Sequence, residues 1–151
     1  MSSNYFALFK IEPTFNINSN ELERKYIELS KIDINERQSK NMKNINKAYQ
    51  ILKSPLKRAE HLLNLFGVRS QKDQHDFEIL NESMKIRECL LNCNNLKFAS
   101  GIIDKKIKGC IENLTNNFAA KNFDEAAMQV LRLKYLYKSF EEVKNATNSN
   151  F

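Results

Sequence analysis

A shortage of turn residues is the feature that most constrains the fold of this chain. Its 151 residues contain only three glycines and two prolines. A β-rich protein of this length needs many tight turns, and glycine and proline are among the residues that supply them. The hydrophobic content of 42%, with ten Phe and five Tyr, suffices for a core of ordinary size. The composition therefore predicts an all-α protein with long helices, in one domain or two small subdomains.

Helix-start signals define the N-terminal half. Asn18 and Glu21 are spaced as a capping box, and an amphipathic segment follows them. Ser54 is a favourable N-cap before Pro55, and Gly67 suits the position after that helix. The intervening stretch SKIDINERQSKN, residues 30–41, is expected to be the tip of a helical hairpin.

The C-terminal half follows a polar segment, VRSQKDQHD. No strand pattern is found there, and apolar residues at helical spacing predict three helices. They extend over about residues 76–92, over 96–118, and from a second capping box at 122–125 to about 143. The sequence thus predicts a helical-hairpin subdomain at 1–67, a linker at 68–76 and a three-helix bundle at 77–151.

Charge and cysteine content limit the function classes. Lys and Arg number 24 against 18 Asp and Glu, and both signs are interspersed. This balance suits an acidic partner surface, and it argues against the alternative of a basic nucleic-acid-binding module. Three cysteines, an odd number, favour a reducing compartment over a disulfide framework. Without a signal-like N-terminus or a membrane-length apolar run, we expect a soluble, cytoplasmic protein. Its oligomeric state is left open by the sequence, with a monomer as the default expectation.

No pattern of an enzyme or a metal site is found. Cys89 and Cys93 could share a helix face, but no histidine or carboxylate completes a ligand set. Small buried hydrophobic residues are the alternative for this pair, and Cys110 suits the core. Neither His61 nor His75 has a nucleophile pattern nearby. We therefore expect no catalytic residue, no metal and no cofactor.

Two surface features are candidates for binding. Arg24, Lys25 and Lys31 form a modest basic patch, for which a solvated face is the alternative. In the segment FEILNESMKIREC, apolar residues are too numerous for one buried stripe. Leu80, Met84 and Glu88 follow at four-residue steps, away from the core positions Ile79, Ile86 and Leu90. They either form a partner-binding surface or pack inside a helical bundle.

The stretches NYFALF, ELERKYIEL, INKAYQILKSPLKRAEHLL, KIRECL and NFDEAAMQVLRLKYL together resemble the HscB family. This resemblance spans nearly the whole chain. It implies a J domain packed on a three-helix bundle, and no enzymatic activity. It also implies a co-chaperone of iron–sulfur cluster assembly, which binds an IscU-type scaffold and delivers it to an HscA/DnaK-type chaperone, whose ATP hydrolysis it stimulates.

The resemblance assigns roles to individual residues. It implies a scaffold-binding surface on the C-terminal helices, formed by Leu80, Met84, Arg87, Glu88 and Tyr135. Asn81 and Lys85 depart from the family pattern, where an apolar and an acidic residue are expected. Chaperone docking falls on the basic patch of residues 24, 25 and 31.

The hairpin tip also departs from the family pattern. J domains carry His-Pro-Asp there, and Ile34, Asn35 and Glu36 occupy the corresponding positions. The tripeptide occurs nowhere in the chain, which argues against ATPase stimulation. Two functional hypotheses follow. One is a co-chaperone with a degenerate J domain, and the other is a scaffold-binding adaptor that activates no chaperone.

Overall fold

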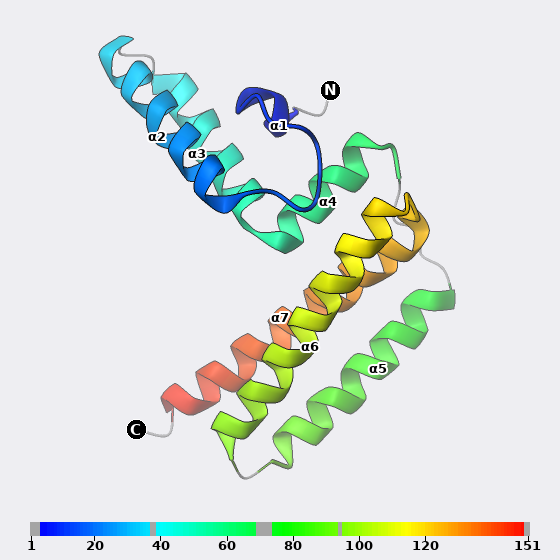
Figure 1. The fold of residues 1–151 in the computed structure, drawn as a ribbon. Helices are drawn as coiled ribbons and strands as arrows, with labels where there is room; N and C mark the ends of the chain where they lie inside the picture. Colours follow the sequence, from blue (N-terminus) through cyan, green and yellow to red (C-terminus); the bar gives the residue numbers. More distant parts are fainter. Residues whose placement is uncertain (1–3, 37–38, 69–73, 94, 150–151) are drawn as a thin grey trace. The chain divides into compact units, whose positions relative to one another are not determined.

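The computed structural model describes residues 4–36, 39–68, 74–93 and 95–149, and helices are its only regular elements there (Figure 1). The all-α prediction is confirmed. The chain divides into two compact units, Met1–Val68 and Arg69–Phe151. The first helix of the second unit begins at Gln74, so the last three residues of the predicted linker are helical.

The described residues of unit 1 form four helices. They are α1 (Tyr5–Leu8), α2 (Ser19–Glu36), α3 (Ser39–Lys53) and α4 (Pro55–Leu65). Helices α2 and α3 form an antiparallel hairpin (Figure 1), and α1 and α4 both pack on α3. The side chains buried between these elements are mainly aromatic and aliphatic: Phe6, Phe9, Phe15, Leu22, Ile45, Ala48, Leu52, Ala59 and Leu62.

The predicted N-cap residues of unit 1, Asn18 and Ser54, both cap their helices. The Asn18 side chain accepts hydrogen bonds from the backbone N–H groups of Asn20 and Glu21. Ser54 caps α4 in the same way, with Pro55 in its first turn. At the other end Gly67 has a φ of +72°. Val68 there donates to the Leu63 carbonyl, which is the six-residue bond of a Schellman motif.

The hairpin connection is shorter than the sequence predicted. Residues 30–41 were expected to be a tip, but α2 extends to Glu36 and α3 already begins at Ser39. Ser30, the first of these residues, donates from its hydroxyl to the Tyr26 carbonyl one turn earlier. No proline or glycine lies in this stretch, so nothing in its sequence stops either helix.

His61 of α4 holds the N-terminal helix in place. Its Nε2 accepts a hydrogen bond from the Tyr5 backbone N–H at 3.2 Å. Its ring stacks on Phe6, with ring centroids 5.6 Å apart. The His61 side chain is buried, and burial lowers its pKa. Since Nε2 is the acceptor, the ring must be neutral with its proton on Nδ1.

We therefore expect the free energy of unfolding to fall as the pH drops below about 6.5. There the unfolded chain binds a proton that the folded ring does not, until the pH reaches the lowered folded pKa. Above about pH 7.5 this contribution is constant. Urea unfolding at several pH values measures the slope, and His61→Gln, whose side-chain oxygen can still accept from Tyr5, should reduce it. An equal slope in that variant would contradict this role.

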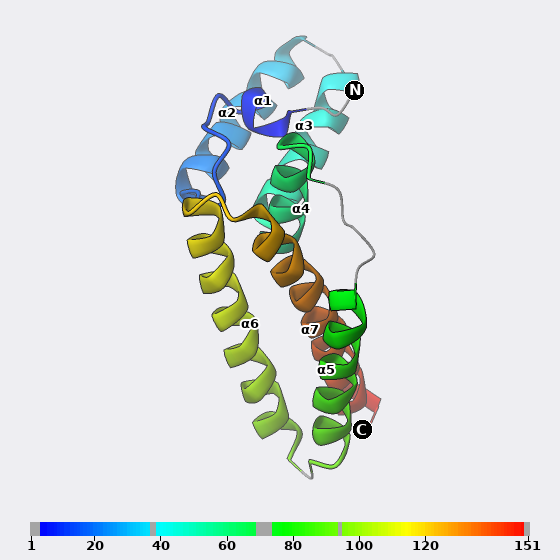
Figure 2. The ribbon, with the colours of Figure 1, turned by 90° about the vertical axis from the view of Figure 1, so that its right-hand side faces the viewer.

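In unit 2 the described residues form three long helices, α5 (Gln74–Leu91), α6 (Leu96–Ala119) and α7 (Phe123–Ser149). Helices α5 and α6 both pack against α7. As Figure 2 shows, α5 and α7 run in the same direction and α6 runs opposite to them. Leucine and isoleucine side chains on the three helices form the core, and the most buried of them are Ile79, Ile103, Leu114 and Leu133.

The last helix is longer than predicted. Its start is as expected, because the Asn122 side chain accepts from the Glu125 backbone N–H. Its end was predicted near Val143, but the helix continues to Ser149. No glycine or proline follows Val143, so nothing in the sequence stops the helix there.

Candidate protein-binding surface

Helix α5 carries apolar residues on two faces, and only one of them is buried. Ile79 and Leu90 are 2% and 4% exposed, whereas Leu80 and Met84 are 38% and 53% exposed. The alternative that both faces pack inside the bundle is therefore wrong. A helix face with exposed Leu and Met side chains is suited to binding another protein.

Two further side chains on the exposed face of α5 were not predicted from the sequence. Phe77 lies three residues before Leu80 and Leu91 lies seven residues after Met84, so all four share one side of the helix. Phe77 is 68% exposed and Leu91 is 75% exposed. Spacing from Leu80 and Met84 could have identified both, but their exposure depends on the absence of a covering helix.

Two ion pairs join α5 and α7. Glu82 pairs with Arg132 at 3.1 Å, and Arg87 pairs with Glu142 at 3.1 Å. The partner number rises along α7 as the residue number rises along α5, as expected for parallel helices. Both pairs are partly exposed, so each adds little stability by itself.

Tyr135 lies on α7 seven residues before Glu142, so these two residues share one side of that helix. Tyr135 is half-buried and, with Ser83 and Ile86 of α5, lines a cavity in unit 2. Arg87, which pairs with Glu142, is seven residues after Leu80 and shares its side of α5.

The remaining candidate, Glu88, lies on α5 between Met84 and Leu91 and is exposed. Asn81 and Lys85, which depart from the family pattern, are exposed as well. The steps from Asn81 to Lys85 and from Lys85 to Glu88 are four and three residues, so these polar side chains form one flank of the apolar stripe.

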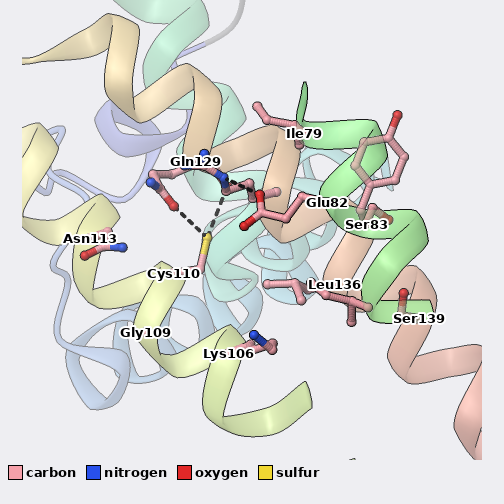
Figure 3. A pocket seen from close by; sticks show the side chains of 13 residues that line it. Ile79, Glu82, Ser83, Lys106, Gly109, Cys110, Asn113, Gln129, Leu136 and Ser139 are labelled. Atoms are coloured by element: carbon pink, nitrogen blue, oxygen red, sulfur yellow. Dashed lines mark hydrogen bonds and ion pairs between the residues drawn. The ribbon is translucent and has the colours of Figure 1, made fainter. Parts of the chain in front are cut away.

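A cavity of about 290 Å³ lies between the three helices of unit 2 (Figure 3). Thirteen residues line it, and its polar centre is Cys110, whose Sγ donates to the carbonyl oxygen and side-chain Oε1 of Gln129 at 3.2 and 3.3 Å. Burial raises the pKa of this thiol to about 11, although Arg132 opposes the shift. The thiol is therefore protonated at neutral pH and is not an activated nucleophile. The predicted buried position of Cys110 is confirmed.

The three residues of the predicted basic patch differ in their surroundings. Arg24 and Lys31 are exposed and seven residues apart, so they share one side of α2 with Ile27, which is 45% exposed. Lys25 points elsewhere, because its Nζ donates to the Lys10 carbonyl at 3.1 Å and pairs with Glu21 at 3.4 Å. Only Arg24 and Lys31 are therefore available together.

Ile34, Asn35 and Glu36, which replace His-Pro-Asp, form the last turn of α2. The backbone there is helical, whereas a proline at position 35 would remove a helical hydrogen bond. Residues 37 and 38, between α2 and α3, lie outside the described residues.

The two cysteines near the end of α5 are not both buried. Cys89 is exposed and Cys93 is half-buried, so the alternative that both are buried hydrophobic residues is wrong. Within the described part of the chain, no three His, Cys, Asp or Glu side chains gather as a metal site would require. Among the helices described, none is long and apolar enough to span a membrane.

Comparisons with known proteins match both units. The family model "HSCB C-terminal oligomerisation domain" matches residues 75–144, which include every candidate residue of unit 2. A co-chaperone protein HscB homolog of Neisseria meningitidis is 32% identical, covering 95% of this chain and 99% of its own.

Two solved structures share the fold. The chaperone HscB from Vibrio cholerae has a TM-score of 0.85 at 25% identity, covering 98% of this chain and all of its own. The human co-chaperone protein HscB has a TM-score of 0.84 at 25% identity, covering 97% of this chain and 83% of its own. The fold and this full-length relative agree with the resemblance found in the sequence, and the chain belongs to the HscB family of co-chaperones.

Proposed function

We propose that this protein is a cytoplasmic, monomeric co-chaperone of iron–sulfur cluster assembly. It binds an IscU-type scaffold protein through α5 and the edge of α7 and delivers it to an HscA/DnaK-type chaperone. The proposal rests on the exposure of Leu80 and Met84 next to the ion pair between Arg87 of α5 and Glu142 of α7. An apolar centre with charged residues at its rim is the usual composition of a protein-binding site.

Contact with the chaperone is assigned to unit 1. Arg24 and Lys31, with Ile27 between them, offer two cations and one apolar side chain on a single side of α2. A surface of this kind suits an acidic patch, and the affinity of such contacts falls as salt concentration rises. The chaperone contact is therefore expected to weaken with salt more steeply than the scaffold contact, whose centre is apolar.

One observation favours the second hypothesis, an adaptor without chaperone activation. His-Pro-Asp, the tripeptide that J domains use to trigger ATP hydrolysis, is replaced by Ile34, Asn35 and Glu36 in the last helical turn of α2. No side chain of these three is a histidine, and no proline interrupts the helix. This supports scaffold binding without full ATPase stimulation.

Single-turnover ATP hydrolysis by the HscA-type chaperone of the same organism separates the two hypotheses. It is measured with the scaffold alone, this protein alone, and both together. Synergy with both present would establish an activating co-chaperone despite the altered tip. Unchanged hydrolysis with intact scaffold binding would establish the adaptor. If the scaffold does not bind at all, the proposed function is wrong, and steeply salt-dependent binding to generic duplex DNA would indicate a nucleic-acid-binding module instead.

A further inference from the structure

The exposed apolar stripe of α5 is longer than the surface assigned to the scaffold. It consists of Phe77, Leu80, Met84 and Leu91, at steps of three, four and seven residues. The two end residues, Phe77 and Leu91, are the most exposed of the four, at 68% and 75%. At 1.5 Å per residue, the stripe extends over about 21 Å of helix.

The residues assigned to scaffold binding form the middle of this stripe. Leu80 and Met84 lie between Phe77 and Leu91 on the same side of α5. A stable protein interface typically covers about 800 Å² on each partner, which is many more residues than one helical turn presents. A partner that covers Leu80 and Met84 along the helix therefore also meets the two end residues.

The residues on the flanks of the stripe limit apolar contact beside its centre. Asn81 and Lys85 are exposed beside Leu80 and Met84, and neither is the residue expected there. They make one flank of the centre polar, and the opposite flank is bounded by the Arg87–Glu142 pair. Along the helix axis, Phe77 and Leu91 offer further exposed apolar contact.

We propose that Phe77 and Leu91 belong to the scaffold-binding surface and determine its specificity. The inference rests on the proposed function. The partner is then a scaffold protein that presents an apolar ridge along the full length of α5. A scaffold whose apolar patch fits only the centre binds more weakly to this chain.

The test measures the affinity of the full chain for the purified IscU-type scaffold of the same organism by calorimetry. Phe77→Ala and Leu91→Ala are each expected to weaken binding about fivefold or more. The matched control is Phe98→Ala, the same truncation as Phe77→Ala at a residue that is 62% exposed but belongs to α6. It should change the affinity less than twofold. All three side chains are exposed, so the melting temperatures should remain close to that of the parent chain.

The outcomes distinguish this inference from the proposed function. Normal affinity of Phe77→Ala and Leu91→Ala, with binding lost on combined replacement of Leu80 and Met84, would overturn the inference and leave the proposed function standing. Normal affinity of all these variants would overturn both assignments of the surface. Self-association of the parent chain in sedimentation, abolished by Phe77→Ala while scaffold affinity is unchanged, would identify a second copy as the occupant and overturn the inference.

Discussion

Combined Leu80→Ala and Met84→Ala replacement is expected to weaken scaffold binding roughly 30- to 700-fold. Each truncation removes apolar contact at the centre of the proposed interface, where a loss of about 1–2 kcal/mol per side chain is typical. Two such losses amount to about 2–4 kcal/mol, and every 1.4 kcal/mol is a tenfold change in the dissociation constant. Because both side chains are exposed, the fold itself should be unaffected.

Calorimetric titration of the scaffold measures this change. Met84→Leu is the conservative control, because it keeps an apolar side chain of similar volume and should retain most of the affinity. Tyr135→Ala tests the neighbouring edge of α7 and should weaken binding by a smaller factor, since that side chain is already half-buried in unit 2. A double variant that binds the scaffold as tightly as the parent chain would show that the surface lies elsewhere.

The largest loss of stability is expected from Leu133→Ala in α7. Leu133 has no exposed area, so its truncation removes buried apolar contacts and leaves a cavity among the three helices. Such replacements cost about 2–5 kcal/mol. This is a large part of the roughly 5–15 kcal/mol that stabilises a domain of ordinary size.

Urea unfolding followed by circular dichroism measures that loss. Leu91→Ala is the matched control, because it is the same chemical change on α5 at a side chain that is 75% exposed. It should alter the free energy of unfolding by less than about 0.5 kcal/mol. A loss below about 1 kcal/mol in Leu133→Ala would contradict the packing of α7 at the centre of unit 2.

The fold class and most helix boundaries follow from local sequence. Asn18, Ser54 and Asn122 cap helices because a side-chain oxygen binds the free N–H groups of the first turn, and this needs only neighbouring residues. After α4 the backbone turns to a φ of +72° at position 67, and glycine adopts this conformation without the strain that a side chain would add. Boundaries without such a signal were predicted wrongly, as at the hairpin connection and after Val143.

The binding surface was only partly determined by the sequence. Periodicity separated Ile79 from Leu80 and Met84, but it left open whether a second helix covers the latter two. It also passed over Phe77 and Leu91, and it grouped Lys25 with Arg24 and Lys31 although the Lys25 ammonium binds the Lys10 carbonyl. Each of these outcomes depends on contacts between residues distant in the sequence. Local pattern fixes which side of a helix is apolar, and only the packing of α5 on α7 decides which apolar side chains remain exposed.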